Sequence, residues 1–119
     1  MKKYQKEFVL IDDDELIQLL WRLSAQDFQV KFFGFTSGSM FFKKSSQFER
    51  DTPIYIDFKF ENSFCGDRVA QKVYQLGFKK IYIATGCLNI DLSHLFFIKG
   101  LVGKDPAWLE KKSSLRGFI

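Results

Sequence analysis

Five residues with charged or hydroxyl side chains each stand at the end of a short apolar run: Asp12, Asp13, Asp57, Thr85 and Lys104. Three carboxylates brought together repel one another unless a cation neutralises them. Mg²⁺ prefers hard oxygen ligands, typically one or two carboxylates together with phosphoryl oxygens and waters. A lysine ammonium supplies positive charge for phosphate, and a threonine hydroxyl supplies a hydrogen bond. Since a carboxylate can itself attack phosphorus, the set indicates Mg²⁺-assisted phosphoryl transfer.

The apolar runs are short and nearly continuous, which is typical of strands buried on both faces. We predict five strands, over residues 8–11, 30–35, 53–56, 80–84 and 100–103. Because the strands alternate with helical segments, we expect a parallel sheet with helices on both faces, a doubly wound α/β domain. The carboxyl ends of its strands meet at one edge, where such folds bind ligands. The five polar residues should converge there.

The helix that follows the first strand shows the clearest periodicity. Four leucines recur at helical spacing after Asp14, which we expect to be the N-cap: Leu16, Leu19, Leu20 and Leu23. We expect this leucine row to be the apolar face of the helix. Further short or medium helices are predicted around Met40–Phe42, over Gly66–Leu76 with Gly77 as its end, within 87–97, and from Pro106.

Length and composition set the class of protein. The 119 residues are 46% apolar and 27% charged, which is usual for a globular protein, and we expect residues 1–119 to form a single domain with a short last helix. No apolar stretch reaches the roughly 20 residues of a membrane span, and the first residues lack the apolar core of a secretory signal. We therefore expect a cytoplasmic protein, in which Cys65 and Cys87 stay reduced.

Lysine and arginine exceed aspartate and glutamate by 18 − 14 = 4 residues. Such a basic balance raises the possibility of nucleic-acid binding. The basic residues are, however, scattered as pairs along the whole chain: Lys2-Lys3, Lys43-Lys44, Lys79-Lys80 and Lys111-Lys112. No recognition helix is evident, so we expect solvated surfaces and no direct contact with nucleic acid.

Four motifs in this order resemble the receiver domain of response regulators, the phosphoacceptors of two-component signalling. They are the acidic pair within Val9–Asp14, Asp57 after Ile54–Ile56, Thr85 within Ile81–Gly86, and Lys104 within Gly103–Pro106. The resemblance covers nearly the whole chain. It implies a flavodoxin-like fold with strand order 2-1-3-4-5.

The resemblance also implies a role for each motif residue. Asp57 would accept a phosphoryl group from the phosphohistidine of a histidine kinase or a histidine phosphotransfer protein. Asp13 and Asp57, with Asp12 acting through a water molecule, would hold Mg²⁺. Lys104 would pair with the phosphoryl group, and Thr85 would move toward it as the switch.

Two flanking residues complete the set that the resemblance implies. Lys59 lies two residues after the acceptor and would add its backbone carbonyl to the Mg²⁺ ligands, and Cys87 lies two residues after Thr85. Both positions would tune the lifetime of the aspartyl phosphate. Leu101 stands where the family has an aromatic switch residue, and the last helix, a dimer surface in the family, is short. A homodimer, a free-standing module and a part of a sensor kinase all stay open.

Two other functions fit parts of the pattern. The altered sequence after Asp57, together with Leu101, fits a receiver-like interaction module that never accepts phosphate. Asp12-x-Asp14, Thr85 and Lys104 fit a haloacid-dehalogenase-like phosphatase in outline. That enzyme needs a further acidic pair after the lysine, where only Asp105 is present, and it gives Asp57 no role. A receiver is not a conventional enzyme, so catalytic turnover separates these functions.

Overall fold

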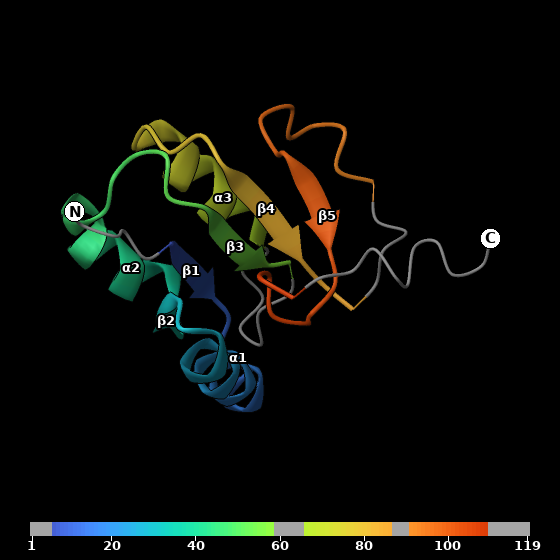
Figure 1. The fold of residues 1–119 in the computed structure, drawn as a ribbon. Helices are drawn as coiled ribbons and strands as arrows, with labels where there is room; N and C mark the ends of the chain where they lie inside the picture. Colours follow the sequence, from blue (N-terminus) through green and yellow to red (C-terminus); the bar gives the residue numbers. More distant parts are fainter. Residues whose placement is uncertain (1–5, 59–65, 87–90, 110–119) are drawn as a thin grey trace.

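Five parallel strands form one sheet in the order β2-β1-β3-β4-β5, in a computed structural model that describes residues 6–58, 66–86 and 91–109 (Figure 1). The strands are β1 (Glu7–Ile11), β2 (Lys31–Phe35), β3 (Ile54–Asp57), β4 (Ile81–Ala84) and β5 (Gly100–Val102). All neighbouring strands pair in parallel. The predicted strands and their order are confirmed.

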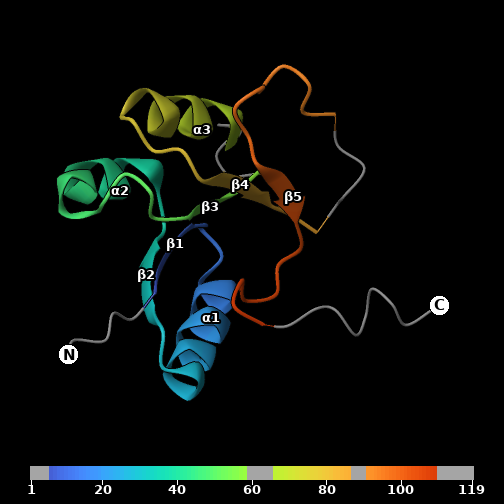
Figure 2. The same cartoon turned by 45° about the horizontal axis from the view of Figure 1, so that its top comes forward.

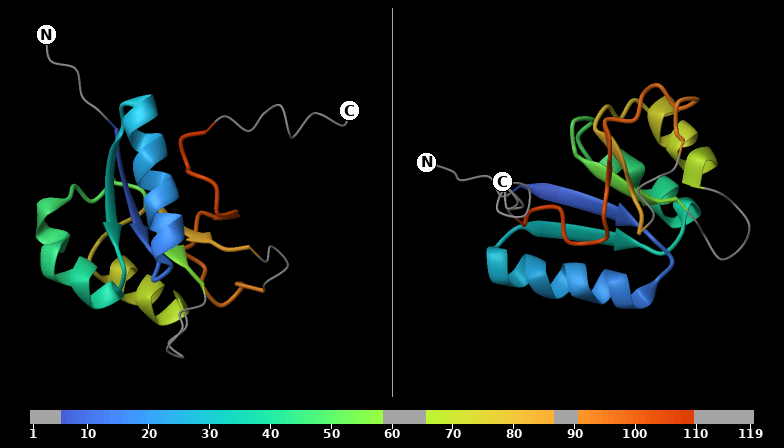
Figure 3. Two further views of the ribbon diagram at one scale, coloured as in Figure 1. Left: turned by 90° about the horizontal axis from the view of Figure 1, so that it is seen from below. Right: turned by 90° about the vertical axis from the view of Figure 1, so that its right-hand side faces the viewer.

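The helices cover both faces of this sheet. Figure 2 shows α1 (Glu15–Phe28) on one side and α2 (Gly38–Lys44) and α3 (Gly66–Gln75) on the other, with a short 3₁₀ turn, η1 (Ser45–Gln47), after α2. The views in Figure 3 show the same two layers around the sheet. The chain therefore forms the doubly wound flavodoxin-like arrangement that its strand–helix alternation predicts.

The α1 helix begins as predicted but buries the opposite face. The Asp14 carboxylate accepts hydrogen bonds from the backbone N–H groups of Leu16 and Ile17, which confirms it as the N-cap. The leucine row is exposed, with 62% of Leu16 and 50% of Leu23 open to solvent. The buried residues of α1 are instead Gln18, Trp21 and Ala25. The expectation for the leucine row was wrong because regular spacing shows that a helix has a leucine face but not which face meets the sheet.

The other predicted helices fall into two groups. The helix α3 ends where expected, since Gly77 follows it with a φ of 102°, a conformation that glycine adopts without a steric penalty. Within the described part of the C-terminal region, 91–99 and 106–109 form turns rather than helices. Residues 87–90 of the predicted segment 87–97 and the remainder of the helix predicted from Pro106 lie outside the described residues.

Two hydrophobic cores lie on the two sides of the sheet. The core under α2 and α3 contains phenylalanine and aliphatic residues, among them Phe41, Phe78 and Ile83. The core under α1 is smaller and centres on Trp21 and Tyr55, with Trp108 packed against it. No helix among the described residues is long and apolar enough to span a membrane.

Candidate functional site

Three aspartates converge at the carboxyl ends of β1 and β3. One carboxylate oxygen from each of Asp12, Asp13 and Asp57 lies within 4.8 Å of the others. Asp12 is fully buried and Asp57 is 7% exposed, while Asp13 is half-buried. The pairing of β1 with β3 explains the convergence, because Ile11 is in register with Ile56. Asp12 and Asp57 follow these two residues directly, and Asp13 comes next after Asp12.

Lys104 lies against two of these carboxylates. Its Nζ donates to Asp12 Oδ2 at 2.6 Å and to Asp57 Oδ1 at 2.8 Å. Burial by itself lowers the pKa of Lys104, but hydrogen bonds and charge attraction from both aspartates outweigh burial, so the pKa lies above its ordinary value. The lysine therefore stays charged and carries its ammonium group directly to Asp57.

Thr85 lies at the same edge, one residue beyond β4. Ala84 is in register with Asp57, so the chain carries Thr85 just past Asp57 on the neighbouring strand. The threonine is buried, and its backbone N–H donates to the carbonyl of Val102 at 2.9 Å. The structure thus places Asp12, Asp13, Asp57, Thr85 and Lys104 at one edge of the sheet, as their positions after the strands predict.

The starts of α1 and α3 both help to position the aspartates. The Oδ1 atom of Asp12 accepts from the backbone N–H of Asp14 at 2.9 Å, which leaves Oδ2 to Lys104. On the other side, α3 begins against β3: a Cβ on Gly66 would overlap the backbone carbonyl of Asp57. Glycine at that position permits α3 to start directly beside the site.

Two residues that the sequence did not mark as functional hold the site in place. The Nε2 of Gln18 donates to the carbonyls of Asp12 at 2.9 Å and Phe35 at 3.0 Å, and so ties the end of β1 to the end of β2. The indole N–H of Trp21 donates to the carbonyl of Lys104 at 2.9 Å. Both side chains lie on the buried face of α1. The sequence pattern that could have identified this face is the spacing of Gln18, Trp21 and Ala25 at i, i+3 and i+7.

Three further predicted positions have different outcomes. Lys59 and Cys87 lie outside the described residues. Leu101, in the position that the resemblance assigns to an aromatic switch, is partly buried and packs against the core under α2 and α3. Its side chain contributes apolar contact there, without the hydroxyl or the ring of an aromatic residue.

The donor set fits a divalent cation. Asp12, Asp13 and Asp57 carry three carboxylates, to which Lys104 adds a single positive charge. Hard carboxylate oxygens clustered in this way suit Mg²⁺, whose two positive charges would balance the remaining negative charge. The side chain of Asp14 caps α1 and lies outside this set.

Comparisons with known proteins rest on the fold. No protein-family model and no curated protein matches the sequence. Among solved structures, the response regulator TrrA from Thermotoga maritima, in complex with Mg(2+)-BeF, is 20% identical over 97% of this chain and 100% of its own, with a TM-score of 0.71.

Two further solved structures are similar at lower identity. A CheY-like receiver domain protein from Methanospirillum hungatei is 14% identical over 97% of this chain and 91% of its own, with a TM-score of 0.68. The N-terminal domain of a three-domain response regulator from Carboxydothermus hydrogenoformans is 12% identical over 93% of this chain and 89% of its own, with a TM-score of 0.71. This chain therefore has the fold of the response-regulator receiver domains.

Proposed function

We propose that this chain is a phosphoacceptor receiver domain, in which Asp57 takes a phosphoryl group from a phosphohistidine in the presence of Mg²⁺. The observation that carries the proposal is the contact of Lys104 Nζ with Asp57 Oδ1 at 2.8 Å beside two further aspartates. The Mg(2+)-BeF complex of TrrA, which shares this fold, supports it. The donor would be a histidine kinase or a histidine phosphotransfer protein, and the module would span 1–119 in the cytoplasm.

The chemistry needs one nucleophile and two kinds of positive charge. An Asp57 carboxylate oxygen attacks the phosphorus, the new O–P bond forms as the N–P bond to histidine breaks, and the freed imidazole nitrogen takes a proton. Lys104 holds the attacking carboxylate and then pairs with the phosphoryl group. Thr85, in the position that follows β4, donates its hydroxyl to a phosphoryl oxygen.

A bound Mg²⁺, held by Asp12, Asp13 and Asp57, would neutralise the carboxylates and the phosphoryl oxygens. The lysine alone leaves two of the three negative charges of these aspartates uncompensated. Repulsion between them and the incoming phosphoryl group would oppose transfer. We therefore expect labelling of Asp57 to require the divalent cation.

One observation favours the alternative of an interaction module that is not phosphorylated. Leu101 packs into the core and offers no aromatic group to respond to a phosphoryl group at Asp57. The phosphatase alternative is weakened by Asp14, because the second aspartate of that motif accepts two backbone hydrogen bonds as the cap of α1. We retain the inert module as the second candidate.

The test is incubation with acetyl phosphate and Mg²⁺, followed by intact-protein mass spectrometry. We expect the mass of one phosphoryl group to appear in wild type, and to be lost in Asp57→Asn or when the cation is chelated. Asp51→Asn, an exposed aspartate before β3, serves as the matched control and should label normally. Absence of an Asp57-dependent adduct would favour the inert module, and steady hydrolysis of a phosphate ester would favour the phosphatase.

A further inference from the structure

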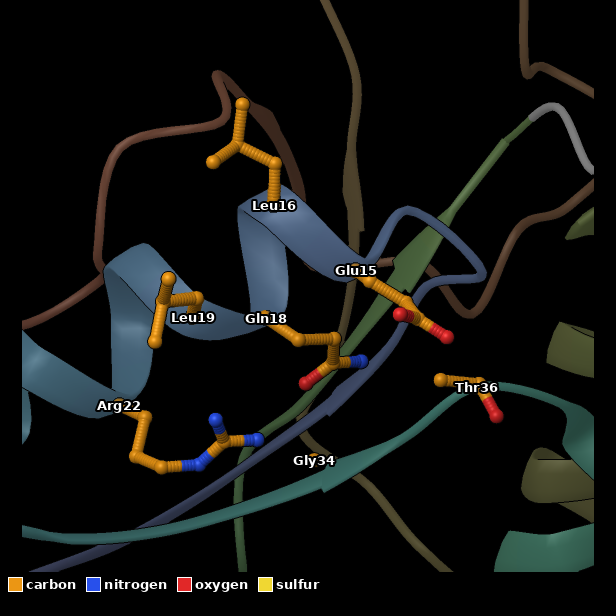
Figure 4. A pocket seen from close by; sticks show the side chains of 7 residues that line it. All are labelled: Glu15, Leu16, Gln18, Leu19, Arg22, Gly34 and Thr36. Carbon is orange, nitrogen blue, oxygen red and sulfur yellow. The ribbon is translucent and has the colours of Figure 1, made fainter.

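A groove of about 600 Å³ lies between α1 and β2 (Figure 4). Glu15, Leu16, Gln18, Leu19 and Arg22 form its helix side. Its other side is formed by Gly34 of β2 and by Thr36, which follows that strand. Its lining includes none of Asp12, Asp13, Asp57, Thr85 and Lys104, so the groove needs an explanation of its own.

A buried oxygen without a partner points into this groove. Gln18 is 3% exposed, and its Oε1 has no hydrogen-bond partner among the described residues. Its Nε2 donates to the backbone carbonyls of Asp12 and Phe35, so the amide orientation is fixed by acceptors that only a nitrogen can satisfy. Figure 4 shows the oxygen directed toward the part of the groove where Arg22 and Gly34 lie. A buried acceptor of this kind requires a donor, because leaving it unpaired is costly.

The strand that borders the groove is an edge of the sheet. β2 pairs with β1 on one side and has no neighbour on the other among the strands that the structure describes. The backbone N–H of Lys31 donates to the carbonyl of Lys6, and the carbonyl of Phe35 accepts from the backbone N–H of Asp12. Because successive residues of a strand point to opposite sides, the backbone N–H and C=O groups of Phe32 and Gly34 point away from β1. A Cβ at Gly34 would overlap Gln18 Oε1, so the glycine is what lets this oxygen lie against the strand. The edge therefore offers backbone hydrogen bonds beside the unpaired acceptor.

Charge and apolar surface narrow the chemistry of the ligand. Arg22 is exposed on α1 and, in Figure 4, extends toward β2 beside Gly34. Leu16 and Leu19 are 62% and 42% exposed, and they add apolar surface to the helix side of the groove. A ligand that pairs with the β2 edge and Gln18 Oε1 needs backbone-type N–H and C=O groups, and one that also contacts Arg22 and the leucines needs a carboxylate and an apolar side chain. An extended peptide provides all of these groups.

We propose that the groove between α1 and β2 binds an extended peptide segment of a partner protein, which adds to the β2 edge. A donor of the peptide pairs with Gln18 Oε1, an acidic side chain pairs with Arg22, and an apolar side chain packs on Leu16 and Leu19. None of these peptide contacts involves Asp57, so the proposal does not rest on phosphoryl transfer there.

The probe is a random linear heptapeptide library displayed on phage and selected against the full chain. We expect enriched peptides that combine an acidic with an apolar residue. Synthetic copies should shift the backbone amide NMR signals of Phe32 and Gly34. Arg22→Ala should weaken their binding about fivefold and Gln18→Leu about tenfold, as for a surface charge pair and a buried hydrogen bond.

Arg68→Ala is the matched control, since Arg68 is an exposed arginine of α3 on the other side of the sheet, and it should leave binding unchanged. If Gln18→Leu does not fold, the exposed Arg22→Ala decides the result. The proposal is overturned if no peptide family is enriched, if Arg22→Ala leaves the affinity unchanged, or if the shifted amides lie elsewhere.

Discussion

The core under α2 and α3 is built from phenylalanine and aliphatic side chains, whereas the core under α1 is built around tryptophan and tyrosine. In the first, Phe41 stacks on Phe48 and also packs against Phe35 and Phe78, all within the apolar layer. In the second, the Trp21 ring packs at 5.4 Å from Trp108 and its N–H reaches the backbone of Lys104. The core under α2 and α3 therefore contributes mainly apolar packing, whereas the core under α1 also contacts the backbone of the candidate site.

The largest effect is expected from a substitution in the core under α2 and α3. Phe41→Ala removes a fully buried ring, and we expect a loss of about 3–5 kcal/mol in the free energy of unfolding, measured with urea. Met40→Ala, at the adjacent exposed position, should change it by less than about 0.5 kcal/mol. A loss below about 1 kcal/mol for Phe41→Ala would show that this core does not dominate stability.

The second prediction concerns the hydrogen bond between Trp21 and Lys104. Trp21→Phe keeps an aromatic ring but removes the indole N–H, and we expect a loss of about 2 kcal/mol in unfolding free energy. Labelling of Asp57 by acetyl phosphate should also slow, because Lys104 is held less firmly. Trp108→Phe instead removes a hydrogen bond to Ser24 and should leave the labelling rate unchanged. Equal labelling rates in the two variants would show that the core under α1 does not influence Asp57.

The third prediction is a loss of stability at high pH. Burial, together with the nearby Tyr82, raises the pKa of Tyr55 to about 12. An unfolded tyrosine loses its proton near pH 10, whereas Tyr55 in the folded chain keeps its proton until about pH 12. The unfolding free energy should therefore fall as the pH rises from about 10 to 12, by roughly 1 kcal/mol after allowance for solvent screening. Urea titrations across this range should show the fall in wild type and a smaller one in Tyr55→Phe.

The fourth and smallest effect belongs to the outer face of α1. Leu20 is 49% exposed, so Leu20→Ser should change the unfolding free energy by less than about 0.5 kcal/mol. If this variant instead unfolds as readily as one with a damaged core, the leucine row contributes to the fold, and the assignment of the buried face of α1 to Gln18, Trp21 and Ala25 would need revision.

Much of this architecture could be predicted from the sequence. The strands buried on both faces produced continuous apolar runs, and the residues that follow them met at one edge because parallel strands end together. Which face of α1 is buried could not be predicted in the same way. Gln18 donates to the carbonyl of Phe35 and Trp21 to the carbonyl of Lys104, which are distant in sequence, so their placement depends on tertiary contacts. The spacing of the leucine row carries no information about those partners.

We propose that Asp57, rather than a neighbouring carboxylate, is the phosphoacceptor, and chemical trapping of the adduct tests this assignment. An acyl phosphate is reduced by borohydride to an alcohol, which marks the acceptor permanently. After labelling with acetyl phosphate and Mg²⁺, reduction and peptide mass spectrometry should find homoserine at position 57. Homoserine at position 12 or 13, or at no aspartate position, would contradict the assignment of Asp57 as the phosphoacceptor.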